Sequence, residues 1–159
     1  MKKMDKRIKT ISISILIVTA LIAIMDIIFY KSLLFGTESQ YLVGDYMIGT
    51  WDLFSKLGIG LILIFSFLYY FYYHRDISET ISIALGSYFL WMYAGISDGF
   101  FFLFQLKPIP DLPWLNGHQF VGTIANIMGN NVTAFSLIIS ILVGSAIVYY
   151  LIKILRFRF

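Results

Sequence analysis

The chain has 159 residues, of which 59% are hydrophobic, 18% are aromatic and only 13% are charged, and its formal net charge is +3. This composition is far too apolar for an ordinary soluble domain and indicates an integral membrane protein. The sequence contains no cysteine, which excludes disulfide exchange, thiol catalysis and cysteine-based metal sites. We therefore expect a multi-pass protein of the cell membrane.

Four apolar runs are long enough to cross a hydrocarbon core of about 30 Å, and they cover residues 10–35, 53–73, 80–106 and 132–155. The first run lacks a small-residue cleavage site, so we interpret it as a retained helix and not as a signal peptide. No linker, low-complexity tract or internal repeat divides the chain. The sequence predicts an all-α fold in a single membrane domain, residues 1–159, built as a bundle of four transmembrane helices.

The distribution of lysine and arginine predicts the orientation of this bundle. Nine of the twelve basic residues fall on the side of the chain termini: Lys2, Lys3, Lys6, Arg7, Lys9, Arg75, Lys153, Arg156 and Arg158. The other side holds only Lys31, Lys56 and Lys107. Because basic residues stay on the cytoplasmic side, we expect both termini to be cytoplasmic. The charges lie at helix ends and form no stripe with aromatic residues, so we expect no nucleic-acid partner.

Two longer connections, Gly36–Asp52 and Leu106–Asn131, are external in this topology. In the second, three prolines within Lys107–Pro113 predict an extended segment, which an interfacial helix over residues 114–128 would follow. Longer loops often act as lids or binding elements, so we expect the function at the external face.

Two aspartates lie within the apolar runs, where an ionisable side chain costs roughly 2.5–3.5 kcal/mol. Asp26 and Asp98 each lie about 9 Å past the middle of a run, and spans one and three run in the same direction, so both acids share one level. Two explanations remain open. Protonated carboxyls could hold the bundle together by hydrogen bonds, with the GxxxG motif Gly95–Gly99 allowing close helix approach. Alternatively, the acids bind a cationic or hydroxylated ligand, or relay protons, in a cavity open outward.

Helix spacing places these acids on defined faces. Thr19, Ala23, Asp26 and Tyr30 recur every three or four residues and predict one small polar face of the first span. The same spacing relates Trp91, Gly95, Asp98 and Phe102 in the third span.

Conventional catalytic chemistry finds little support in the sequence. The only histidines, His74 and His118, fall on opposite sides of the predicted membrane, so we expect no haem, and we predict no metal, cofactor or catalytic residue. An acid pair can act as general acid and base, but no nucleophile or metal set accompanies it, so an enzyme is not required. A proton pathway is disfavoured because the cytoplasmic halves of the spans offer little beyond serine and threonine.

Several short segments resemble one known family. These segments are Met25-Asp26, Trp51-Asp52, Tyr93-Ala-Gly-Ile-Ser-Asp98, and Asn126 with Asn130 or Asn131. Together with the four-span topology, they resemble the emopamil-binding and sterol-isomerase superfamily, the EXPERA domain. That family carries an acid in the second span and its isomerases use a membrane histidine, and this chain has neither. What the resemblance still implies is an amphiphile-binding cavity. In it, the two aspartates pair with an amine or hydroxyl, and Trp91 and Tyr93 supply aromatic walls.

Two functions follow as hypotheses. The first is binding of a small amphiphile or lipid in an outward-facing, aspartate-lined cavity, with membrane lipids and a hydrophobic small molecule as partners. Its candidate residues are Asp26, Asp98, Trp91, Tyr93, Asp52 and His118. The second is an accessory subunit of a larger membrane complex or a homo-oligomer. There, the small residues Ser136, Ser140 and Gly144 of the fourth span would pack against a partner, although they suit packing within the bundle equally well.

Overall fold

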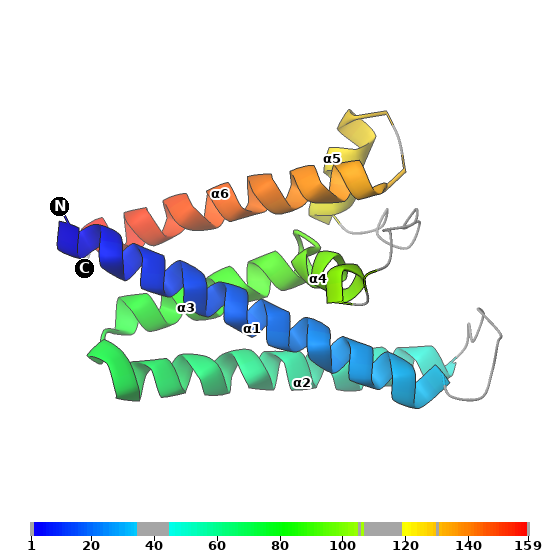
Figure 1. Ribbon diagram of the computed structural model, residues 1–159, viewed down its shortest axis with the longest axis horizontal. Coiled ribbons are helices and arrows are strands. Elements are labelled where there is room, and N and C mark those ends of the chain that lie inside the picture. The colour runs from blue at the N-terminus through cyan, green and yellow to red at the C-terminus, as the bar shows by residue number, and fades with distance from the viewer. Residues whose placement is uncertain (1, 35–44, 105, 107–118, 130, 159) are drawn as a thin grey trace.

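The computed structural model describes residues 2–34, 45–104, 106, 119–129 and 131–158 (Figure 1). These residues form helices joined by turns, which confirms the predicted all-α class. The elements are α1 (Lys2–Leu34), α2 (Asp45–Tyr69), a short π-helical turn η1 (Tyr70–His74), α3 (Ile77–Met92), α4 (Ile96–Phe104), α5 (Gln119–Ile127) and α6 (Ala134–Arg158).

Among the described residues, three helical segments are long and apolar enough to cross a membrane by themselves, namely Lys6–Ile28, Leu53–Tyr73 and Ala134–Leu155. They correspond to the predicted first, second and fourth spans. The third apolar run, predicted as one helix over residues 80–106, is instead divided into α3 and α4, which are bent by 71° relative to each other. The predicted interfacial helix over 114–128 corresponds to the shorter α5, and residues 114–118 lie outside the described residues.

Both chain ends lie at the same end of the bundle, together with the connection between α2 and α3 (Figure 1). We call this the terminal end. Helix α1 packs against α3 and α4, whereas α3 also contacts α2 on one side and α6 on the other. Helix α5 packs on α6 at the opposite end of the bundle.

Large apolar side chains are exposed on every long helix. Examples are Ile17 and Ile28 on α1, Leu63 and Phe67 on α2, and Leu142 on α6. Apolar exposure of this extent is unusual for a soluble protein and suits contact with lipid tails. The helix lengths and the apolar exposure together indicate a membrane protein.

The division of the third span has a local cause. The backbone N–H groups of Tyr93 and Ala94 both donate to the carbonyl of Phe89, at 3.0 and 3.2 Å, and Gly95 follows with a φ of +74°. A positive φ suits glycine and ends an α-helix. The continuous apolar pattern conceals this break, because no proline marks it.

Helix α6 supports the break from the side. The hydroxyl of Ser140 donates to the backbone carbonyl of Ala94 at 3.1 Å, in the buried interior. A Cβ atom on Gly144 would come 2.7 Å from the Cβ of Ala94, so only glycine allows α6 to approach this closely. The small residues of the fourth span therefore pack within the bundle.

Candidate functional site

The two membrane aspartates come together near the division of the third span. Asp26 lies on α1 and Asp98 lies in the first turn of α4, and these two helices pack against each other. Both side chains are half-buried, and their carboxyl groups are close enough to interact electrostatically. Two acidic side chains from packed helices thus lie within electrostatic range of each other inside an apolar bundle.

The position of Asp98 at the beginning of α4 has an electrostatic consequence. A Cβ atom on Gly95, the residue before the helix, would lie 3.8 Å from Oδ2 of Asp98, so the carboxyl group reaches back to the helix start. The N-terminus of a helix carries partial positive charge and favours an anion there. The break in the third span therefore provides a local stabilising environment for one of the two acids.

Of the two helix faces predicted to carry the aspartates, the structure agrees with the one on α1 and not with the one in the third span. Thr19 and Ala23 are fully buried and Asp26 is half-buried on α1, which agrees with the predicted shared face, while the side chain of Tyr30 lies outside the described part of the structure. The hydroxyl of Thr19 bonds to backbone carbonyls of its own helix at 3.0 Å, so it is already satisfied there. The predicted face that joins Trp91, Gly95, Asp98 and Phe102 is wrong, because the 71° bend separates Trp91 on α3 from the two residues on α4.

The two aromatic candidates lie in different environments. Trp91 is buried in a cluster with Phe54, whose ring meets it edge-on at 5.9 Å between centroids, and its indole occupies the space that a side chain at Gly58 would need. Tyr93 is 37% exposed and stacks on Phe89 at 5.7 Å. Trp91 therefore belongs to the core between α1, α2 and α3, and Tyr93 belongs to the surface.

Two further candidates cannot be placed against the aspartates. Asp52 belongs to α2, but its side chain lies outside the described part of the structure. His118 lies outside the described residues altogether. Both stay predictions.

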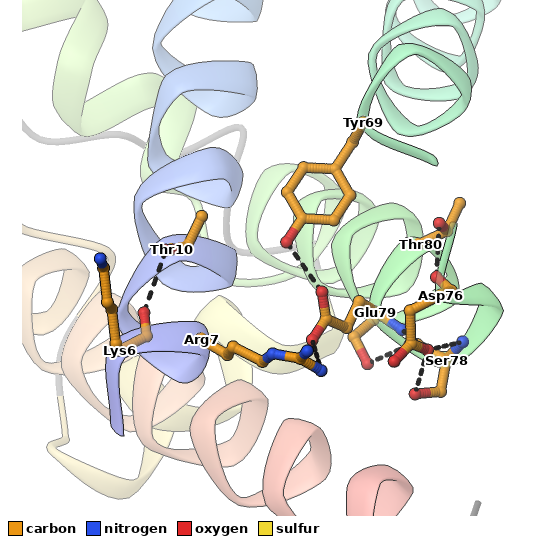
Figure 2. A network of polar contacts seen from close by, with 9 residues as sticks. Lys6, Arg7, Thr10, Tyr69, Asp76, Ser78, Glu79 and Thr80 are labelled. Atoms are coloured by element: carbon orange, nitrogen blue, oxygen red, sulfur yellow. Dashed lines mark hydrogen bonds and ion pairs between the residues drawn. The ribbon is translucent and has the colours of Figure 1, made fainter. Parts of the chain in front are cut away.

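The sequence analysis missed a second acidic centre, which lies at the terminal end. Glu79 in the first turn of α3 is fully buried, and its Oε1 lies 3.6 Å from Nη1 of Arg7 on α1. The hydroxyl of Tyr69, at the end of α2, donates to Oε2 of Glu79 at 3.0 Å. Figure 2 shows how these side chains from three helices converge. We call this group the Arg7–Glu79–Tyr69 clamp.

The sequence carried a signal for this centre. Glu79 shares the inward face of α3 with Ile83, Gly86 and Leu90, at spacings of three and four residues. A carboxyl group on the buried face of a helix requires a partner, and this spacing could have identified it. Glu79 lies next to a short connection, where charged residues are common at the ends of membrane spans, so its sequence position alone did not single it out.

The start of α3 is fixed by its own cap. The carboxyl group of Asp76 accepts hydrogen bonds from the backbone N–H groups of Ser78 and Glu79, at 2.9 and 3.3 Å (Figure 2). Arg75, just before it, adopts a left-handed conformation with φ of 50°. An aspartate cap of this type sets where a helix begins, and so it sets the position of Glu79.

Within the described residues, no group of three or more His, Cys, Asp or Glu side chains is arranged to hold a metal ion. The two acidic centres are therefore the candidate sites for chemistry in this part of the chain. Comparisons with protein-family models, with curated proteins and with solved structures find no match to this chain.

Proposed function

We propose that this protein binds a small amphiphile or lipid through an amine or hydroxyl group at Asp26 and Asp98. The observation that carries the proposal is that two half-buried carboxyl groups, on the packed helices α1 and α4, lie within electrostatic range of each other. Like charges in an apolar environment repel strongly, and a cationic or hydrogen-donating ligand group placed between them relieves that repulsion. Acids within membrane-spanning segments are costly, and they usually mark functional sites.

The surroundings of the pair support an amphiphilic ligand. Large apolar side chains near both acids in sequence are exposed, with Ile24 and Ile28 on α1 and Leu103 on α4. A ligand with its polar group at the carboxyls could leave its apolar body against these side chains or in the lipid. The resemblance to the emopamil-binding superfamily supports the same ligand class. We place the opening on the external side, since the excess of lysine and arginine assigns the terminal end to the cytoplasm.

The alternative, an accessory subunit, would need a new contact surface. Ser136 and Ser140 are buried within the chain, and Gly144 packs on Ala94. The small-residue ridge is therefore already engaged by α3 and the break that follows it. A partner subunit would have to dock on the apolar faces that we assign to lipid.

The proposal can be tested by native mass spectrometry of protein that is gently solubilised from its own membrane. The native chain should carry a discrete small-molecule adduct. Asp26→Asn and Asp98→Asn should each lose an adduct that binds through an amine, because an amide cannot pair with a cation, and should weaken one that binds through a hydroxyl, because an amide oxygen is a poorer acceptor than a carboxylate. Glu79→Gln is the matched control, since it removes a carboxylate at the other end of the bundle and should retain the adduct.

Two outcomes would contradict the proposal. One is an adduct that all three variants retain equally, which would place the ligand elsewhere. The other is a stoichiometric larger partner without any adduct, which would favour the accessory subunit. Unfolding curves of the variants would ensure that a lost adduct does not reflect a lost fold.

A further inference from the structure

Four exposed basic side chains lie at the terminal end of the bundle. They are Lys6 and Lys9 on α1, Lys153 on α6, and Arg75 in the connection between α2 and α3. We call these four residues the basic cluster. The ends of α1 and α6 bring further bases of the sequence to the same end (Figure 1), and only their backbones belong to the described part of the structure: Lys2, Lys3, Arg156 and Arg158.

Lysines from two different helices lie at the same level of the bundle. A Cβ atom on Gly86 of α3 would come 2.7 Å from Ile15 of α1 and 2.9 Å from Val148 of α6, so these two residues share one depth. Lys9 precedes Ile15 by six residues, and Lys153 follows Val148 by five. Since α1 begins and α6 ends at the terminal end, the two lysines lie about 9 and about 7.5 Å from that depth, in the same direction.

The acids at the terminal end do not neutralise the basic cluster. The carboxyl group of Asp76 accepts hydrogen bonds as the cap of α3, and Glu79 pairs with Arg7. Within the part of the chain that the structure describes, none of the four bases forms an ion pair. By sequence, nine bases at this end face only three acids, the third being Asp5, so a surplus of positive charge is available to a partner.

Exposed tyrosines lie next to the basic cluster on two sides of the bundle. On α6, Tyr149 and Tyr150 are 45% and 62% exposed and lie about one helical turn deeper than Lys153. On the side of α2, Tyr72 is 82% exposed and precedes Arg75 by three residues. Tyrosine followed by lysine or arginine at the end of an apolar helix is typical of the place where a span leaves the hydrocarbon for the headgroup layer.

Exposed aliphatic side chains also accompany the bases. Ile154, directly after Lys153, is 56% exposed, and Ile77, two residues after Arg75, is 64% exposed. A soluble acidic partner would have to cover these apolar side chains. A phospholipid supplies a phosphate for the base and hydrocarbon for its neighbours. The surroundings of the basic cluster therefore favour a lipid.

We propose that the basic cluster binds the phosphate groups of anionic phospholipids in the leaflet that surrounds the terminal end. Lysine and arginine donate charge-assisted hydrogen bonds to phosphate oxygens. Each base near an anionic membrane surface strengthens the attraction about fivefold, which corresponds to about 1 kcal/mol. Lys9 is separated from Asp26 by about 25 Å of helix α1, so the lipid site does not depend on the ligand proposed for the aspartates.

Native mass spectrometry of the full chain in an uncharged detergent can measure this binding, with phosphatidic acid as the probe. This lipid has a phosphate but neither an amine nor an alcohol group, so it does not match the ligand proposed for the aspartate pair. The native chain should retain it. The triple variant Lys6→Gln, Lys9→Gln and Lys153→Gln should bind it more weakly by at least about tenfold, since each base contributes a factor of about five.

Three controls separate charge at this position from other causes. Arginine at the same three positions keeps the charge and should bind phosphatidic acid as the native chain does. Lys56→Gln removes an exposed lysine near the other end of α2 and should change the binding little. Asp26→Asn should also leave the binding of phosphatidic acid unchanged, whatever it does to the ligand proposed for the aspartates.

The proposal is overturned if the triple glutamine variant retains phosphatidic acid as the native chain does. It is also overturned if Lys56→Gln weakens binding as much as Lys9→Gln, because any exposed lysine would then serve. Equal competition by water-soluble glycerol 3-phosphate would indicate a site for free phosphate and not for lipid. The single variants Lys9→Gln and Lys153→Gln, each expected to weaken binding about fivefold, decide the question if the triple variant does not fold.

Discussion

The two acidic centres of this bundle differ in what surrounds their carboxyl groups. At the terminal end, buried Glu79 meets a guanidinium and a phenol from two other helices. At the other centre, half-buried Asp26 meets a second acid, Asp98. The first arrangement compensates a charge within the chain and joins three helices. The second places two acids within electrostatic range of each other, and it is there that we propose a ligand binds.

The same contrast extends to packing. The terminal end is stabilised by a polar clamp between long helices, whereas the divided third span is stabilised by close approach of α6 through Gly144 and Ser140. Stability should therefore respond to charge at one end and to side-chain size at the other. Four substitutions test this division.

Arg7→Ala should cause the largest loss, about 3 kcal/mol of unfolding free energy, because it leaves the buried carboxylate of Glu79 without its cation. This value is at the low end of the range for such pairs, since Arg7 is partly exposed. Denaturant unfolding in mixed micelles measures it. The double variant Arg7→Ala with Glu79→Gln should recover part of the lost unfolding free energy. If the double variant is less stable than Arg7→Ala alone, Arg7 does not compensate the charge of Glu79.

Gly144→Ala should cost about 2 kcal/mol, because the added methyl group overlaps Ala94 and forces α6 away from the break. Gly60→Ala is the control: a Cβ atom there meets nothing within 4 Å. The control should be neutral or stabilising by up to about 1 kcal/mol, as alanine is the better helix former. Equal losses in both variants would contradict the close packing of α6.

Ser140→Ala should cost between about 1 and 2 kcal/mol, since it removes the hydrogen bond to the buried carbonyl of Ala94. Ser145→Ala, on the same helix and only half-buried, should change the unfolding free energy little. Thermal unfolding of the pair of variants compares them directly. An indistinguishable result would mean that the break does not depend on the hydroxyl of Ser140.

Asp26→Asn should have the smallest effect on stability, within about 0.5 kcal/mol, and the sign should favour the folded state because repulsion from Asp98 disappears. The same denaturant titration measures it. A loss as large as that of Arg7→Ala would instead mean that the two aspartates hold the bundle together, which is the other explanation of the pair.

Much of the helical architecture is predictable from the sequence because apolar runs of sufficient length dominate it. The division at residues 93–95 is not, since the segment from Tyr93 to Asp98 contains no proline and keeps the apolar pattern. A single glycine in an apolar run is compatible with a continuous helix. Gly95 allows the turn, and the hydroxyl of Ser140 in another helix satisfies the buried carbonyl of Ala94 there, a contact that local sequence does not reveal.

The candidate site shows the same dependence on tertiary contacts. Asp26 and Asp98 are identifiable because an acid deep in an apolar run is costly wherever it faces. Glu79 lies near the end of a run, where charged residues are common, and only its contacts with Arg7 and Tyr69 distinguish it. Arg7, Glu79 and Tyr69 come from three different helices, so their positions along the sequence do not reveal that they meet.

The divided third span also constrains how the protein is made. Helix α4 has nine residues and is about 14 Å long, less than half the thickness of the hydrocarbon core, so it cannot insert as an independent stable segment. Its junction with α3 is completed by groups on α6, which is synthesised after both of these helices. Nascent chains that do not yet contain α6 should therefore hold an unfinished third segment, and it should become protected from proteolysis only when α6 has been added.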